Sequence, residues 1–347
     1  MSWIDDLGLA WPILQAPMAG AQGVELAAAV SEAGGLGALP AAMLDPQALD
    51  AALGEYRARS ARPLNVNAFC HEAPPPDPEA LARWQARLAP YYAEYGVTPP
   101  EPASGAGRRP FDAAACEVLE VHRPTVVSFH FGLPAPALLD RVKAWGARVL
   151  SSATTVEEAR WLEAHGADAI IAQGLEAGGH RGSFLHDDMT TQVGTLALVP
   201  QVREAVAVPV IAAGGIAGPR SVAAARALGA AAVQVGTAFL GCPESTIGEG
   251  HRRALLSGEA RHTALTDLYS GRPARGLVTR LMRELGPMGE GVPAFPLATA
   301  ALAPLRAAAE AAGSSDFSPL WAGQDTSGCR AVPAARQLRW LAGEPGL

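Results

Sequence analysis

A glycine-rich loop that carries one histidine stands out between residues 170 and 182. The run reads Ile-Ile-Ala-Gln-Gly-Leu-Glu-Ala-Gly-Gly-His-Arg-Gly, so it begins like a buried strand and ends as a loop. Glycine has no Cβ, which lets the backbone approach a flat or anionic ligand closely. His180 has an ordinary pKa that suits proton transfer near neutral pH. We therefore expect an active site at this loop, with His180 as a general base or as a group that polarises the substrate.

A second histidine, His130, follows another apolar run and stands between Phe129 and Phe131. Two interpretations stay open for it. A histidine between aromatic residues can be packed and hydrogen-bonded within the protein, or it can contact a substrate beside His180.

Two glycine-containing strand ends predict a phosphate site. Gly214-Gly215 follows one apolar run, and Gly236-Thr237 follows the next. In many (β/α)₈ barrels a phosphate lies between the loops after the last two strands. Backbone N–H groups and a hydroxyl without bulky neighbours suit that role. Each pair alone could simply turn a strand into a helix, but both pairs at matching positions favour a phosphate-bearing ligand.

Amide side chains at other strand ends indicate a flat heterocycle. Asn67, Gln173 and Gln234 can each donate and accept hydrogen bonds, as the ring N–H and C=O groups of a flavin require. Carboxylates are sparse at the strand ends, and the histidines form no HxH or HExxH pair, so we expect no metal site. The run His186-Asp187-Asp188 is interpreted as a solvated loop.

The elements that must position these residues alternate between short apolar strands and alanine-rich helices. Such strands are typical of a parallel sheet that is covered on both faces. Eight of them predict a (β/α)₈ TIM barrel. A doubly wound open sheet is the alternative, but residues 15–20 lack the GxGxxG that it would place after the first strand. The strands are expected near Pro12, Gly35, Pro63, Thr125, Arg148, Asp168, Val208 and Ala231, and the helices over 24–33, 46–60, 136–145, 156–165, 196–206 and 219–228.

Two segments break this alternation. Residues 72–120 are rich in proline and contain an amphipathic piece, Trp84–Tyr95, whose aromatic residues are expected to pack in a lid or packing arm. The chain after Leu240 has helical patterns and no evident strand. We therefore predict a barrel over 1–240 and an α-helical C-terminal region over 241–347 that packs on it.

Composition narrows the function classes. The 347 residues are 49% apolar and carry a net charge of −7, which disfavours nucleic acid and anionic membranes as partners. The sequence predicts neither a signal peptide nor a bilayer-spanning stretch. Cys70, Cys116, Cys242 and Cys329 form no CxxC pair and are expected to be free thiols in a reducing, cytoplasmic setting.

In an ordered set of motifs the chain resembles the nitronate monooxygenase family, formerly called 2-nitropropane dioxygenases, and most of all its class I type. The resemblance covers nearly the whole chain, and the order of the motifs makes it specific. The motifs are Pro12–Gly20, Leu64–Asn67, Ser128–Pro134, the glycine-rich loop over residues 170–182, Ala213–Ile216, Gln234–Thr237, Ser270–Arg275 and Leu320–Gln324.

The resemblance implies an FMN-binding barrel that oxidises alkyl nitronates, such as propionate 3-nitronate, with O₂ to a carbonyl compound and nitrite. His180 matches the family's catalytic histidine, and His130 would face the substrate. Phe295 stands where the family's active-site tyrosine is expected, which removes a hydroxyl from the substrate site. The implied FMN contacts are Pro17, Met18, Ala19, Asn67, Gln173, Gly178 and Gly179, with the phosphate at Gly214, Gly215, Gly236 and Thr237 and with Gln234 and Val235 beside it.

Two other functions stay open. Related flavin barrels reduce quinones or enoyl thioesters with NAD(P)H, and a non-catalytic FMN-binding protein would need the same cofactor loops. A nitronate is already an anion, so His180 would be needed as a base only for a neutral nitroalkane. The partners expected are a small-molecule substrate and O₂, in a monomer or a homodimer.

Overall fold

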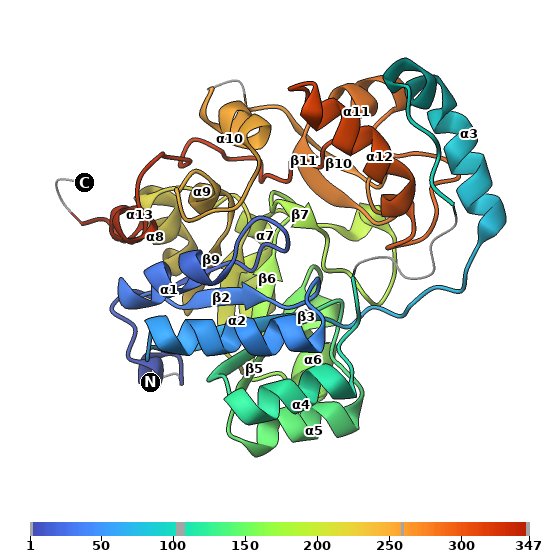
Figure 1. Ribbon diagram of the computed structural model, residues 1–347. Coiled ribbons are helices and arrows are strands. Elements are labelled where there is room, and N and C mark those ends of the chain that lie inside the picture. The colour runs from blue at the N-terminus through green and yellow to red at the C-terminus, as the bar shows by residue number, and fades with distance from the viewer. Residues whose placement is uncertain (1–2, 102–107, 258–259, 345–347) are drawn as a thin grey trace.

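An eight-stranded parallel sheet curls into a barrel at the centre of the protein (Figure 1). The computed structural model describes residues 3–101, 108–257 and 260–344. The barrel closes where the Leu36 N–H donates to the Ile13 carbonyl (3.0 Å) and the Gln15 N–H donates to the Leu36 carbonyl (2.9 Å). The predicted barrel is therefore confirmed. Its strands, in spatial order, are β1 (Ile13–Gln15), β9 (Ala232–Val235), β8 (Val210–Ala213), β6 (Ala169–Gln173), β5 (Arg148–Ala153), β4 (Val126–His130), β3 (Leu64–Phe69) and β2 (Gly37–Pro40).

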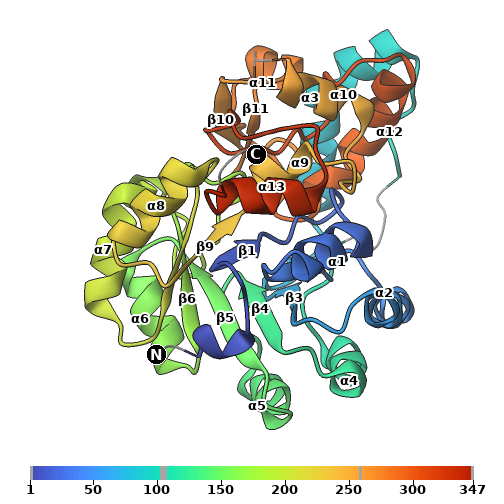
Figure 2. The same cartoon turned by 90° about the vertical axis from the view of Figure 1, so that its left-hand side faces the viewer.

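Helices surround this sheet (Figure 2). Several start where a side chain accepts the first free backbone N–H groups, as Asp45, Asp112 and Thr155 do. The six predicted helices are all present within a residue or two of their predicted ends. The helices between consecutive barrel strands are α1 (Val24–Glu32), α2 (Pro46–Arg59), α4 (Ala113–His122), α5 (Pro136–Ala144), α6 (Val156–Ala164), α7 (Thr195–Ala205) and α8 (Pro219–Ala227).

Side-chain alternation along the strands decides what faces the inside of the barrel. Leu14, Val126 and Ile171 belong to a small apolar cluster of buried strand residues, whereas Val127 and Val233 pack in the clusters shared with the helices. Every second residue of a strand faces the same side, so the inward-facing series can be followed to the carboxyl end of each strand. At these ends the inward-facing side chains are polar. These are Asn67, His130, Gln173 and Gln234, and all four line the same cavity.

Strands also occur after residue 240, so the expectation of a purely helical C-terminal region was wrong on this point. β10 (Thr263–Thr266) pairs with β11 (Ala274–Leu277), which pairs with β7 (Gly179–His180) in the glycine-rich loop. His180 therefore lies on a strand that pairs with a strand of the C-terminal region. The helices of this region are α10 (Glu249–Leu256), α11 (Arg280–Leu285), α12 (Ala298–Ala311) and α13 (Ala334–Leu341). Before residue 241 the chain also forms the short helix α9 (Thr237–Leu240) and 3₁₀ helices over Asp5–Leu7 and Met189–Thr191.

The segment 72–120 contains a packing arm and an ordinary barrel helix. Its first half forms α3 (Pro78–Tyr95), and its second half enters α4 between the barrel strands β3 and β4. Trp84 and Leu88 of α3 are fully buried against α12 and its surroundings, and the Tyr92 hydroxyl donates to the Ala301 carbonyl (2.7 Å). The predicted packing role of the aromatic residues is confirmed. Residues 102–107 of this segment lie outside the described part.

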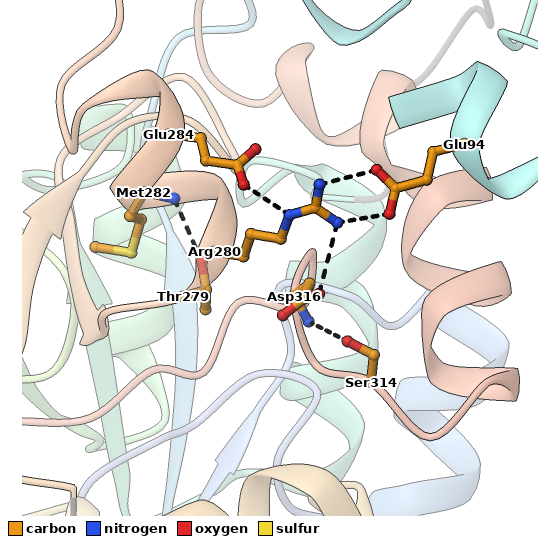
Figure 3. A network of polar contacts seen from close by, with 7 residues as sticks. All are labelled: Glu94, Thr279, Arg280, Met282, Glu284, Ser314 and Asp316. Carbon is orange, nitrogen blue, oxygen red and sulfur yellow. Dashed lines mark hydrogen bonds and ion pairs between the residues drawn. The ribbon is translucent and has the colours of Figure 1, made fainter. Parts of the chain in front are cut away.

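An ion-pair network adds to this attachment (Figure 3). The Arg280 guanidinium donates to both carboxylate oxygens of Glu94 on α3 (2.7 and 2.8 Å) and to Glu284 (2.8 Å), and Asp316 lies 3.9 Å away. Partly exposed pairs of this kind contribute about 0–1 kcal/mol each. The buried apolar contacts of α3 therefore supply most of its attachment.

The last helix of the chain returns to the barrel. Leu338 and Leu341 of α13 are fully buried in the same cluster as Leu26 and Val30 of α1. Helix α13 therefore fills the position that an eighth barrel helix would take, although it lies about a hundred residues after β9 in the chain. The domain division at residue 240 stays a prediction, and the structure places the end of the C-terminal region in the barrel core.

Candidate active site

A cavity of about 530 Å³ lies between the carboxyl ends of the barrel strands and the C-terminal region. Active sites of (β/α)₈ barrels occur at this end. Most of the predicted site residues meet here, and only Val235 and Phe295 are not among the lining residues. Those that line the cavity are Pro17, Met18, Ala19, Asn67, His130, Gln173, Gly178, Gly179, His180, Gly214, Gly215, Gln234, Gly236 and Thr237.

Val235 faces away from the cavity for a geometric reason. Gln234 points into the barrel, so the next residue along β9 must point out, and the Val235 side chain is buried among the helices. Its carbonyl accepts a hydrogen bond from the Ala16 N–H (2.8 Å). The expected cofactor contact of Val235 stays a prediction: its side chain lies away from the cavity, and its carbonyl holds the start of the loop that contains Pro17 and Met18.

Two adjacent glycines of the glycine-rich loop differ in their surroundings: one is closely packed by the protein, and the other borders open space. A Cβ on Gly178 would come within 2.5 Å of the Gly323 nitrogen, so the protein's own packing requires glycine there. Gly179 has φ +71°, and a Cβ on it would meet no protein atom within 4 Å. Gly179 therefore leaves open space at the cavity wall, where a ligand can approach the backbone.

The two strand ends predicted to bind phosphate are also closely packed. Gly214 and Gly215 have φ of +110° and +65°, and a Cβ on Gly214 would lie 2.9 Å from Thr195 Oγ1. The Thr237 hydroxyl accepts a hydrogen bond from the Gly323 N–H (2.9 Å) and keeps its own proton to donate. These residues turn the strands and at the same time leave donors at the cavity.

The three amides differ in what they still can bind. Asn67 Nδ2 donates to Ser128 Oγ (3.0 Å), and no hydrogen bond of its Oδ1 occurs in the described part of the chain. Gln234 Oε1 is buried without a hydrogen-bond partner. Gln173 donates to the His180 carbonyl (2.9 Å) and accepts from the Gly182 N–H (2.8 Å), so its amide fixes the loop. Asn67 and Gln234 remain available for a polar heterocycle.

His130 also holds the loop. Its Nε2 lies 3.3 Å from the His180 carbonyl, which can only accept, so Nε2 carries the proton and Nδ1 accepts from the Ser152 hydroxyl (2.8 Å). Burial, and then the charge of Arg272, lowers the pKa of His130 from 6.5 to about 3. The ring is therefore neutral, and both nitrogens are already engaged within the protein. The substrate contact of His130 stays a prediction, with apolar ring contact as the form that this geometry allows.

His180 is held by one side-chain hydrogen bond. Its Nε2 lies 2.9 Å from Ser270 Oγ, and that hydroxyl donates to the Arg272 carbonyl (3.3 Å). Nε2 is then the donor, and Nδ1 of the neutral ring keeps a lone pair with no partner among the described residues. Burial comes first and the nearby Arg108 second in keeping the pKa of His180 well below 6.5. The ring is therefore neutral at neutral pH, as a general base must be.

Aromatic rings surround His180. Phe295 lies 5.1 Å from it, Trp321 5.6 Å and Phe69 6.5 Å between ring centroids. Phe295 is buried beside His180 and is not among the lining residues, and its expected substrate contact stays a prediction. Trp321 and Phe69 line the cavity.

A buried arginine lies under the loop. Arg181 is fully buried and donates to the carbonyls of Gln173 (2.8 Å) and Gly174 (2.7 Å) and to Gln192 (2.9 Å). Burial lowers its pKa to about 10, so it stays charged. Arg181 thus ties the strand end to the loop and sets the direction in which His180 leaves the strand.

A sequence model described as "Nitronate monooxygenase" matches residues 2–339, nearly the whole chain. The chain belongs to the nitronate monooxygenase family. It is 43% identical to a nitronate monooxygenase of Paraburkholderia phytofirmans over 96% of this chain and 92% of that protein. It is 44% identical to one of Pseudomonas aeruginosa over 97% of both chains. The resemblance predicted from the motifs is confirmed.

Solved structures agree with this membership of the nitronate monooxygenase family. A nitroalkane oxidase from Streptomyces ansochromogenes superposes with a TM-score of 0.90 at 42% identity, over 99% of this chain and 97% of that one. FabK from Thermotoga maritima superposes with a TM-score of 0.71 at 28% identity, over 99% and 95%. The family makes the chain an oxidoreductase and implies a flavin cofactor.

Membrane-spanning helices and metal-ligand clusters are both absent from the described residues. None of the helices there is long and apolar enough to cross a membrane. In the same ranges no group of three or more His, Cys, Asp or Glu side chains could hold a metal ion.

Sequence reasoning missed several residues of this nitronate monooxygenase site. Ser270 and Trp321 stand in motifs that carry the family resemblance, but no local pattern gives them a role. Arg108 lines the cavity from the end of the arm, and Phe69 extends the inward-facing series of Asn67 on β3. The alternation along β3 could have located Phe69. The others depend on contacts between distant parts of the chain.

Acid should weaken this fold through its buried histidines. Burial lowers the pKa of His71 and His251 to about 4 and of His130 to about 3, and that of His180 lies well below 6.5. In the unfolded chain these groups bind protons from about pH 6.5 downward. Their contribution to stability is thus present above pH 6.5 and is lost as the pH falls toward 4.

We expect the free energy of unfolding to fall between about pH 6.5 and pH 4, more steeply than the ~1.4 kcal/mol per pH unit of one group. Denaturant titrations across this range measure it. Most carboxylates in the protein titrate below this window. A free energy of unfolding that stays constant from about pH 6.5 to 5 would contradict the assignment of these histidines as neutral.

Proposed function

We propose that the protein is an FMN-dependent nitronate monooxygenase, which oxidises alkyl nitronates with O₂ to a carbonyl compound and nitrite. Membership of the nitronate monooxygenase family over nearly the whole chain carries the proposal. The hydrogen bond between His180 Nε2 and Ser270 Oγ adds a neutral histidine with a free Nδ1 at the cavity, which would let the site also use a neutral nitroalkane. Such a nitrogen can accept a proton from the carbon next to a nitro group. Membership of the family supports the redox part of the reaction.

The residues present fit a flavin. The unpartnered Gln234 Oε1 and the open space at Gly179 are features that a flat ring with N–H groups would use. Pro17, Met18 and Ala19 would contact the ring, and Asn67 would add a hydrogen bond. Gly214, Gly215, Gly236 and Thr237 would hold the phosphate of FMN. When bound, the flavin supplies electron transfer, which is chemistry of the cofactor rather than of any side chain here.

The chain's own residues bind and orient the substrate and move one proton. Ser270 fixes the Nε2–H of His180, so that Nδ1 can take the proton from a neutral nitroalkane. Trp321 and Phe69 line the same cavity. A substrate supplied as the nitronate has already lost this proton, so its oxidation needs no base.

Gly179→Ala tests the cofactor position. The methyl group would enter the open space at the cavity wall, so we expect flavin affinity to fall at least about tenfold, with each tenfold step corresponding to ~1.4 kcal/mol. Gly96→Ala is the matched control, since Gly96 also has positive φ (+62°) and open surroundings but ends an outer helix. Both variants carry the ~1 kcal/mol strain of alanine at positive φ. Equal flavin affinity in the two variants would refute the placement of the ring at Gly179.

Anaerobic mixing tests the function. We expect the oxidised flavin band of the loaded protein to bleach rapidly with a nitronate and slowly with NADH or NADPH. Rapid bleaching by NAD(P)H, with no reaction toward nitronate, would replace the proposal with the reductase function. A protein that binds no flavin when FMN is added would refute the cofactor assignment itself.

A further inference from the structure

An arginine without an acidic partner lies in the wall of the cavity. Arg108 lines the same space as His180, and no carboxylate lies within 4.0 Å of its guanidinium in the described ranges. Its guanidinium stacks over the Phe295 ring, 5.8 Å from the ring centroid. The same ring packs against His180 on a neighbouring side. Arg108 and His180, the proposed base, therefore both contact the Phe295 ring.

Burial lowers the pKa of Arg108, and the charged neighbour that adds to this effect is Arg306, a cation that is itself paired with Glu310 (2.8 Å). Arg272 also has no ion pair among the residues that the structure describes, and its Nε is buried without a partner. His71 is buried beside them, and neither of its ring nitrogens makes a side-chain hydrogen bond. A half-buried guanidinium in such a setting is favourable only when an anion binds to it.

Neighbouring residues hold the Arg108 side chain in place. One terminal nitrogen, Nη1, donates to the Thr299 hydroxyl (3.1 Å), and that hydroxyl in turn donates to the Tyr269 carbonyl (3.1 Å). The remaining N–H groups of Arg108 have no partner in the described ranges. A planar guanidinium with a free edge matches a carboxylate, to which it can donate two parallel hydrogen bonds.

We propose that Arg108 determines the substrate specificity of this site by binding a carboxylate at the far end of the nitronate. A carboxylated nitronate is a substrate that the family resemblance already implies; the new element is that Arg108 binds its carboxylate while the nitronate group lies near His180. This inference rests on the proposed function. Thr299 is a positioning residue, and Arg272, whose Nε is buried without a partner, adds positive potential.

A pair of substrates that differ only in the terminal group tests the proposal. Propionate 3-nitronate carries the carboxylate, and propyl-1-nitronate has a methyl group in its place. For Arg108→Met we expect kcat/KM to fall about 10- to 100-fold for the carboxylated substrate, mainly through KM, and to stay within about threefold for the other. Arg108→Lys should recover part of this loss, because the charge remains but the paired hydrogen bonds do not.

Arg253→Met is the matched control. Arg253 also lines the cavity but is exposed, and we expect kcat/KM to change less than about twofold for either substrate. Flavin content and circular dichroism of each variant show that it is folded and loaded. An equal loss of kcat/KM on both substrates in Arg108→Met would overturn the proposal and place the nitronate group itself at Arg108. No loss on either would also overturn it.

The proposed function can fail separately. If the wild-type protein oxidises neither nitronate, the function falls, and the specificity proposal falls with it. If the wild type oxidises both with similar kcat/KM and Arg108→Met changes nothing, the function stands and only the role of Arg108 is refuted.

Discussion

His180→Gln lowers kcat/KM for a neutral nitroalkane by about 10²- to 10⁴-fold, the range expected for a lost general base. Glutamine can still reach toward Ser270 with its amide, but it has no nitrogen that accepts a proton. Oxidation of the same compound supplied as its nitronate should fall by less than about tenfold, because that substrate has already lost the proton. Initial rates of O₂ uptake with each form of nitroethane measure both values.

Ser270→Ala is the companion variant. It removes the partner of Nε2 and leaves Nδ1 in place. We expect a loss of about 3- to 30-fold on the neutral substrate, since the ring loses one hydrogen bond of ~0.5–1.5 kcal/mol and part of its orientation. If His180→Gln keeps the wild-type rate with neutral nitroalkanes, His180 is not the base.

The second large effect concerns stability. Arg181→Leu leaves the carbonyls of Gln173 and Gly174 and the side chain of Gln192 without their donor in a fully buried place. Loss of one partner of such a buried charged group costs about 3–5 kcal/mol. We therefore expect the free energy of unfolding to fall by that amount, measured by denaturant titration. The flavin should also bind more weakly, because the loop that carries Gly179 loses its support.

Arg280→Leu is the matched control for this change. Arg280 makes several ion pairs, but they lie near the surface in the network between α3 and α11 (Figure 3). Its removal should cost no more than about 1–2 kcal/mol. Equal destabilisation by the two substitutions would mean that burial of Arg181 does not set its contribution.

The barrel could be predicted from the sequence because each of its strands is a local signal. Eight short apolar runs such as Ala169–Gln173 occur in the chain, and helices with clear ends separate most of them. Strands β10 and β11 gave no such signal, since Thr-Ala-Leu-Thr and Ala-Arg-Gly-Leu are not apolar runs. Their pairing with His180 forms through contacts across the fold. The packing of α13 on the barrel could not be predicted either, because an apolar helix face in the sequence does not identify the element that packs against it.

Part of the site could be predicted from the sequence, and part of it could not. The glycines and amides at strand ends could be placed in one cavity because a barrel brings all its strand ends together. What each side chain does there depends on partners elsewhere in the chain. Gln173 and His130 are engaged by the His180 loop, whereas Ser270 lies 90 residues after His180 and Arg108 lies 72 residues before it. The inward alternation could have excluded the Val235 side chain from the sequence alone.

Simultaneous measurement of O₂ uptake and nitrite release tests the central claim most directly. Purified protein loaded with FMN is mixed in air with propionate 3-nitronate, and both signals are followed in the same sample. We predict that O₂ is consumed and nitrite accumulates at rates proportional to the amount of FMN-loaded protein, with no NADH or NADPH present. Absence of nitrite release under these conditions, or release that occurs only when NAD(P)H is added, would contradict the account.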